Sequence, residues 1–151
     1  RAFFRQENGN ESLTWETKRL NKAVDAKHVT FLFLGGTGWI SQPESSGFTL
    51  TLNGDDVLHF DVTNSSREWS NSDTGVILKF VCTWKSDVDS AGFFFLQVPT
   101  AMLHQGEPLK VTIQSEGTGS LRWFSVDEVT DSVRLHALML NAVLRHNEAQ
   151  K

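Results

Sequence analysis

The feature that most constrains the fold of this chain is the pair Asn53-Gly54, which lies between two stretches of alternating apolar residues. Asn-Gly readily adopts the positive φ angles of a tight turn, and a two-residue period places the apolar side chains of a strand on one face. The pattern therefore predicts a β-hairpin over residues 46–62. The predicted inward side chains are Phe48, Leu50, Leu52, Leu58, Phe60 and Val62. The opposite face carries Thr49, Thr51, His59 and Asp61.

Similar alternation predicts further strands along most of the chain, at residues 28–36, 75–85, 93–99, 108–117 and 121–126. Polar turn residues separate these strands, and no strand–helix–strand alternation indicates a parallel sheet. About eight short strands with regular turn signals predict a mainly β fold, an antiparallel β-sandwich or jelly roll.

The strand at 28–36 is apolar on both of its faces. Phe31 and Phe33 alternate there with Leu32 and Leu34. A strand with one solvated face would instead alternate apolar and polar residues. We therefore expect both faces of this strand to be covered.

The strand at 75–85 continues its apolar face through Cys82 and Trp84. Cys82 is the one cysteine of the chain, so no internal disulfide can form, and we interpret it as a buried small apolar residue rather than a nucleophile. Trp84 and Trp123 alternate with core residues and are expected in the core. Trp15 lies in an expected edge strand, and its position stays open.

The chain divides into three expected parts: an N-terminal arm and first strand at 1–27, the β-sandwich at 28–126, and a C-terminal segment at 127–151. From Thr130 to about Arg145 the residues favour a helix, with no Gly or Pro. We expect this helix to pack on the sandwich or on a partner, and a further strand is the alternative. Its apolar stripe is Val129, Val133, Ala137, Leu140 and Leu144, widened by Leu135, Leu138, Met139 and Val143.

Composition excludes two classes of partner. The net charge is −4 and the basic residues form no run, whereas a nucleic-acid surface needs a basic patch. No apolar run reaches the length of a transmembrane helix, so no membrane partner is expected. The first residue is Arg1 and no signal peptide follows it. We expect a processed protein or a segment of a longer chain.

Two stretches, FTLTLNGDDVLHFDV and FLQVPTAMLHQGEPLKVTI, give residues 28–126 a resemblance to the galactose-binding-like β-sandwich or jelly-roll domains. Such domains occur as carbohydrate-binding modules and as accessory domains of glycoside hydrolases. The resemblance implies a non-catalytic module of a secreted or periplasmic polysaccharide-degrading enzyme, with a poly- or oligosaccharide and the catalytic domain of the same parent chain as partners. The alternative is a structural domain without a ligand, which docks on a catalytic domain or forms an oligomer.

For a saccharide site, Trp39 and Trp69 are the candidate stacking residues, because both are expected in polar, flexible loops, the second at 63–75, rather than in an apolar alternation. The C–H face of a sugar ring packs against a flat indole while polar neighbours bind its hydroxyls. Gln42 and Glu44 near Trp39, and Arg67 near Trp69, are the candidate polar contacts. The alternative is that each indole folds back as a plug over the end of the core.

No cofactor is expected, and the sequence singles out no catalytic pair among its 18 acidic residues. A structural calcium ion is considered at Asp87 and Asp89, or at Asp55 and Asp56, because calcium prefers carboxylate oxygens. Aspartates in turns also cap backbone groups without any metal. The five histidines have no zinc-site spacing, and no GxSxG elbow is present. A small stand-alone hydrolase therefore remains a third, weaker alternative.

Overall fold

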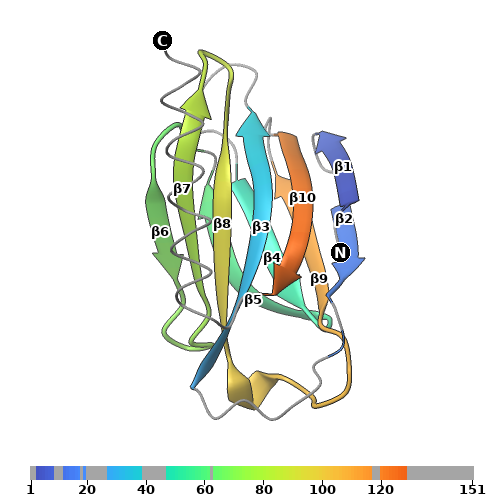
Figure 1. Cartoon of the computed structure of the whole chain (residues 1–151). Coiled ribbons are helices and arrows are strands. Elements are labelled where there is room, and N and C mark those ends of the chain that lie inside the picture. The colour runs from blue at the N-terminus through green and yellow to red at the C-terminus, as the bar shows by residue number, and fades with distance from the viewer. Residues whose placement is uncertain are drawn as a thin grey trace.

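A computed structural model of the 151-residue chain describes residues 3–8, 12–17, 19, 27–38, 47–61, 63–116 and 120–128. Within these ranges the chain forms two antiparallel sheets that stack face to face (Figure 1). The six-stranded sheet has the order β1 (Phe3–Asn8), β10 (Ser120–Glu128), β3 (His28–Gly38), β8 (Asp89–Pro99), β7 (Ile77–Lys85) and β6 (Arg67–Ser70). The four-stranded sheet has the order β2 (Ser12–Glu16), β9 (Lys110–Glu116), β4 (Gly47–Leu52) and β5 (Asp55–Asp61). The predicted antiparallel β-sandwich is confirmed.

The predicted hairpin is the β4–β5 unit. Its turn residues Asn53 and Gly54 have φ angles of 50° and 92°, as the Asn-Gly pair requires. The turn is also tied to the neighbouring strand β9. The Asn53 N–H donates to the Lys110 carbonyl at 2.9 Å, and the Lys110 N–H donates to the Asn53 side-chain oxygen at 3.0 Å. These bonds fix the end of the four-stranded sheet.

Strand pairing is nested along the chain. The innermost pair is β4 with β5, and β3 with β8, β2 with β9 and β1 with β10 enclose it in turn. The β6–β7 hairpin is inserted between β5 and β8 and extends the six-stranded sheet at its edge. Strands β1 and β2, which the sequence places ahead of the sandwich, thus belong one to each sheet.

The core lies between the two sheets and is rich in phenylalanine. Each buried Phe ring contributes about 1.5–3 kcal/mol relative to leaving it in water. Two pairs lie ring to ring, Phe80 with Phe94 at 4.6 Å and Phe48 with Phe60 at 5.0 Å between centroids. Fully buried rings are Phe31, Phe33, Phe48, Phe60, Phe80 and Phe94.

Both faces of β3 are buried, as the sequence predicts. Phe31 and Phe33 point into the sandwich core, whereas Leu32 points the opposite way and packs with Phe95 of β8. Leu32 is nevertheless 0% exposed and Phe95 is 5% exposed. The outward face of the six-stranded sheet is therefore covered at its centre.

The helix expected from Thr130 to about Arg145 lies outside the described residues. Of the C-terminal segment expected at 127–151, only residues 127 and 128 are described, and they are the last residues of β10. The helical element in the described ranges is one 3₁₀ turn, Thr100–Met102. Among these residues, no helix has the length and the apolar composition that crossing a membrane needs.

Candidate functional site

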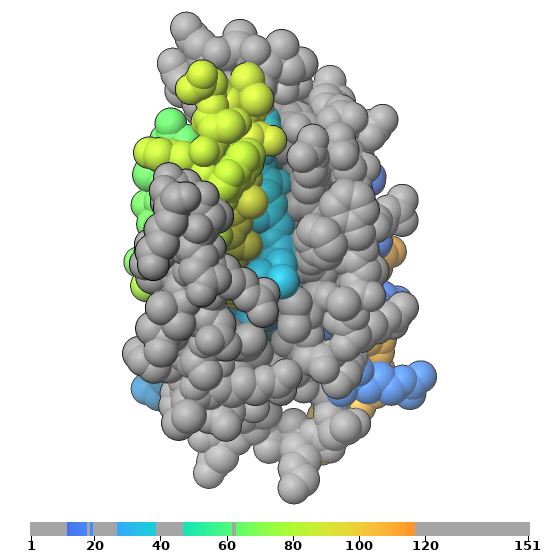
Figure 2. All heavy atoms as spheres, turned by 45° about the horizontal axis from the view of Figure 1, so that its top comes forward, coloured from blue at the N-terminus to red at the C-terminus, as the bar shows by residue number. Residues whose placement is uncertain are grey.

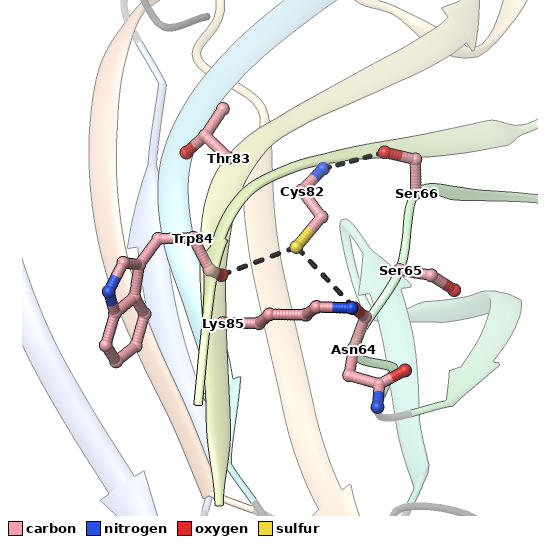
Figure 3. Close-up of a pocket in the computed structure, with 7 residues that line it drawn as sticks. All are labelled: Asn64, Ser65, Ser66, Cys82, Thr83, Trp84 and Lys85. Carbon is pink, nitrogen blue, oxygen red and sulfur yellow. Dashed lines mark hydrogen bonds between the residues drawn. The ribbon is translucent and has the colours of Figure 1, made fainter. Parts of the chain in front are cut away.

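The described residues form a groove of about 370 Å³ where the turn before β6 meets the end of β7 (Figure 3). One wall comes from residues 64–66 and the other from residues 82–85. The groove is lined by Asn64, Ser65, Ser66, Cys82, Thr83, Trp84 and Lys85. Hydroxyl, amide and ammonium groups therefore converge at one corner of the sandwich.

The first wall is held in place by buried hydroxyl groups. The Ser65 N–H donates to the Thr63 Oγ1 at 3.2 Å, which closes a tight turn of the kind that Ser and Thr side chains stabilise. From strand β8, the Ser90 hydroxyl donates to the Thr63 carbonyl at 2.6 Å, and Thr37 of β3 lies 3.3 Å from the Ser90 oxygen. This turn is thus anchored to the six-stranded sheet, so the wall is preformed.

Cys82 lies between the two walls. Its backbone N–H donates to the Ser66 Oγ at 3.0 Å, and its thiol is 3.4 Å from the Trp84 carbonyl and 3.8 Å from the Asn64 carbonyl. Burial raises the pKa of the Cys82 thiol, although the Trp84 backbone and the Lys85 charge act in the opposite direction. The thiol stays protonated at neutral pH and is a poor nucleophile. It is half-buried against the core, less than the sequence predicts.

The prediction that Trp84 lies in the core is wrong. Cys82 pairs with Gly92, but Trp84 pairs with Ala91, because a β-bulge at Thr83 shifts the register. A bulge sets two residues against one, so the strand's inward and outward positions exchange beyond it. Trp84 consequently lies on the outward face and is 42% exposed.

Figure 3 shows how the side chains divide around the end of β7. The indole of Trp84 points away from Cys82, whereas the side chain of Lys85 extends toward Asn64. A ligand at this corner would meet a flat apolar ring on one side of the strand and polar groups on the other. Lys85 and the protonated Cys82 are the ionisable residues that line the groove, so it contains no pair of carboxylates for acid–base chemistry.

Trp69 and Arg67, two of the predicted saccharide contacts, lie together on β6, but the indole is in the core. Trp69 is 8% exposed and packs on Phe60 with 5.6 Å between ring centroids. The Arg67 guanidinium carbon lies 5.5 Å from the indole centroid, a cation–π contact, and Arg67 also reaches the Asp61 carboxylate at 3.9 Å. Since a buried ring offers no face to a sugar, Trp69 is a core plug, the alternative that the sequence left open.

The other three predicted contacts, Trp39, Gln42 and Glu44, lie outside the described residues. Their saccharide role stays a prediction. Of the two remaining tryptophans of the sequence analysis, the structure describes the side chain of one. Trp15 is buried and meets Phe33 edge to face at 5.1 Å, and the side chain of Trp123 is not among those described.

Two of the four aspartates considered for calcium, Asp56 and Asp89, have side-chain partners in a strand or turn. Asp89 accepts a 2.5 Å hydrogen bond from the Ser86 hydroxyl, and Asp56 accepts one at 3.0 Å from Thr51. Within the ranges that the structure describes, no three His, Cys, Asp or Glu side chains gather as metal ligands would. Asp56 therefore bonds across the β4–β5 hairpin, and Asp89 stabilises the turn before β8.

Sequence reasoning missed the groove itself. Asn64, Ser65 and Lys85 are ordinary polar loop and strand-end residues in the sequence, and nothing in their spacing connects them. The exposure of Trp84 depends on a bulge at Thr83, for which the unbroken alternation of residues 75–85 gives no signal.

No family model and no curated protein matches this chain. One solved structure, described as the Clostridium perfringens CspB protease, aligns with 87% of this chain at 10% identity and a TM-score of 0.37. The chain spans 28% of the length of that protein. A likeness at this level supports no conclusion about fold or function.

Proposed function

We propose that this chain is a non-catalytic accessory module of the jelly-roll type, which binds a saccharide at the corner formed by Trp84 and the adjoining groove. The observation that carries the proposal is the exposure of Trp84, at 42%, beside a preformed polar groove. A flat indole suits the apolar face of one sugar unit, and the groove on the other side of the strand offers partners for the hydroxyls of a neighbouring unit.

Three further features support a binding role. The nested strand pairing of the two sheets is the arrangement expected when a long hairpin folds into a jelly roll, in line with the resemblance at residues 28–126. The groove wall at Thr63 is already fixed by Ser90, so little ordering would oppose binding. The described residues that line the groove also include no carboxylate for hydrolysis. As a module of a secreted or periplasmic enzyme, the chain would raise the enzyme's local concentration on its polymer.

The test is isothermal titration calorimetry of the chain with a panel of plant, algal and host polysaccharides. We expect at least one of them to bind with millimolar or tighter affinity. Replacing Trp84→Ala should weaken that binding about tenfold, because the stacked ring is lost. Val88→Ala is the matched control, since Val88 is 57% exposed in the neighbouring turn and lies outside the groove.

Two results would overturn the proposal. One is the absence of binding at millimolar concentration across the panel. The other is a Trp84→Ala variant that keeps its fold and binds as tightly as the original chain. Either result leaves the alternative from the sequence, a structural domain without a ligand that docks on a catalytic domain.

A further inference from the structure

The groove beside Trp84 is rich in hydrogen-bond donors. The Lys85 ammonium carries three N–H donors and no acceptor, and the Asn64 amide adds two more donors. Figure 3 shows the Lys85 side chain extending toward Asn64, so the two residues line the same part of the groove. A ligand group that accepts several hydrogen bonds would suit this arrangement.

Several acceptors at the groove are instead directed at Cys82. The backbone carbonyls of Asn64 and Trp84 lie 3.8 Å and 3.4 Å from its thiol. The Ser66 Oγ accepts the Cys82 backbone N–H at 3.0 Å, which leaves the Ser66 O–H as a further donor toward a ligand. Donors therefore outnumber the acceptors that remain for a ligand.

The charge of the groove is positive. Within the described ranges no carboxylate forms an ion pair with Lys85, whereas Arg67, next to the groove in sequence, is 3.9 Å from the Asp61 carboxylate. Burial raises the pKa of the Cys82 thiol, and the Lys85 charge opposes that increase. The Lys85 charge thus acts on the interior of the groove.

The acidic residues closest to Lys85 in sequence do not cancel this charge. Asp87 and Asp89 are not among the residues that line the groove. Asp89 accepts a hydrogen bond from the Ser86 hydroxyl in the turn between β7 and β8. Asp87 is exposed in the same turn, where water and salt screen its charge. An anion in the groove would therefore meet a cation and no lining carboxylate.

We propose that the groove binds an acidic saccharide, through the carboxylate of a uronic acid or the sulfate ester of a sulfated sugar. This inference rests on the proposed saccharide function and specifies its ligand. Lys85 would pair with the oxyanion, while Asn64 and Ser66 would donate hydrogen bonds to it. Charge-assisted hydrogen bonds are about twice as strong as neutral ones, and a neutral sugar would leave the ammonium without an anionic partner.

Trp84 and the groove would bind two adjoining units of a polymer. The indole points away from Cys82, so ring stacking and acid recognition lie on opposite sides of the end of β7. In Figure 2, β7 in yellow-green and β6 in green lie side by side at the surface. A saccharide chain that crosses the end of β7 would reach both sides, whereas a single sugar would reach one.

The test is isothermal titration calorimetry with pairs of polysaccharides that differ only in charge. Polygalacturonate is compared with its methyl-esterified form, and κ-carrageenan with its desulfated form. We expect at least one charged polymer to bind about tenfold more tightly than its neutral form, and its affinity to fall as the salt concentration rises. The two pairs also distinguish a carboxylate from a sulfate ester as the recognised group.

Substitutions of exposed lysines on β7 locate the charge that matters. Lys85→Met removes the ammonium and should weaken binding of the charged polymer about tenfold. Lys85→Arg keeps the charge and should retain most of the affinity. Lys79→Met is the matched control, because Lys79 is also an exposed lysine of β7 but lies outside the groove, and it should leave the affinity unchanged.

A substitution on the other wall tests the same site from a second residue. Asn64→Asp keeps the shape of an exposed side chain but places a negative charge in the groove. It should weaken binding of the charged polymer at least as much as Lys85→Met does. Circular dichroism of each variant checks that the sandwich still folds.

The outcomes separate this inference from the proposed function. If a neutral polysaccharide binds through Trp84 and neither charged polymer binds more tightly than its neutral form, the ligand is not acidic and the proposed function stands. Equal affinity of the original chain and Lys85→Met for the charged polymer would also overturn the inference. If no polysaccharide of either kind binds, the proposed function itself fails.

Discussion

The two outward faces of the sandwich differ in chemistry, although both belong to antiparallel sheets of one core. The outward face of the four-stranded sheet is polar, and its side chains form hydrogen bonds between neighbouring strands. Thr49 donates to the Glu116 carboxylate at 2.8 Å and lies 3.1 Å from His59 Nδ1. The face of the six-stranded sheet instead presents Leu32 and Phe95, which are buried.

The difference shows what alternation in a strand does and does not specify. In β4, polar residues at every second position leave one face to water, as is common in antiparallel sheets. In β3, the consecutive apolar residues from Phe31 to Leu34 require a cover on both faces. Both strands belong to antiparallel sheets, so the identity of the outward residues separates a solvated face from a buried one.

The largest expected effect comes from removing an aromatic ring that is buried on the outward face of the six-stranded sheet. We expect Phe95→Ala to lower the free energy of unfolding by about 3 kcal/mol, because it leaves a cavity under a covered face. Urea unfolding followed by circular dichroism measures the change. Lys79→Ala is the control on the same face, since this exposed residue pairs with Phe95, and it should change stability by less than about 0.5 kcal/mol. If Phe95→Ala also lowered the free energy of unfolding by less than about 0.5 kcal/mol, the outward face of this sheet would not stabilise the protein as a buried core does.

The fold was largely predictable because its signals are local. The turn chemistry of Asn53-Gly54 and the alternation around it fix a hairpin whatever the rest of the chain does. The two apolar faces of the strand that contains Leu32 likewise predict burial on both sides, and the structure confirms it.

The candidate site was not predictable because its signals are not local. Trp84 faces outward only because one extra residue, Thr83, bulges against the partner strand, and the sequence contains no mark of that register shift. Trp69 follows polar loop residues in the sequence, yet its ring reaches Phe60 in the core. The sequence neighbours of Trp84 and Trp69 therefore gave the wrong location for both indoles. The groove in turn brings together Asn64 and Lys85, which are far apart in the sequence.

A smaller effect is expected on the polar face. Thr49→Val keeps the shape of the side chain but removes both hydrogen bonds of its hydroxyl, to Glu116 and to His59. Because Thr49 is largely buried, we expect a loss of about 1 kcal/mol in the free energy of unfolding. The same urea experiment measures it. His59→Ala removes only one of the two partners of Thr49, both of which are exposed, and should cost less. A larger loss for His59→Ala would show that the imidazole contributes more to stability than the Thr49 hydroxyl does.

The smallest effect is expected for Thr112→Val, in the middle of the same polar face. The Thr112 hydroxyl lies 3.0 Å from the Thr14 hydroxyl across strands β2 and β9, but this pair is exposed, so water can replace the bond. Valine keeps the branched shape that strands favour, and we expect a change of less than about 0.5 kcal/mol. Thr14→Val and the double variant complete a cycle that isolates the pair. A coupling above about 1 kcal/mol would mean that exposed hydroxyl pairs also stabilise this sheet, and the contrast between a structural outward face and a solvated one would no longer hold.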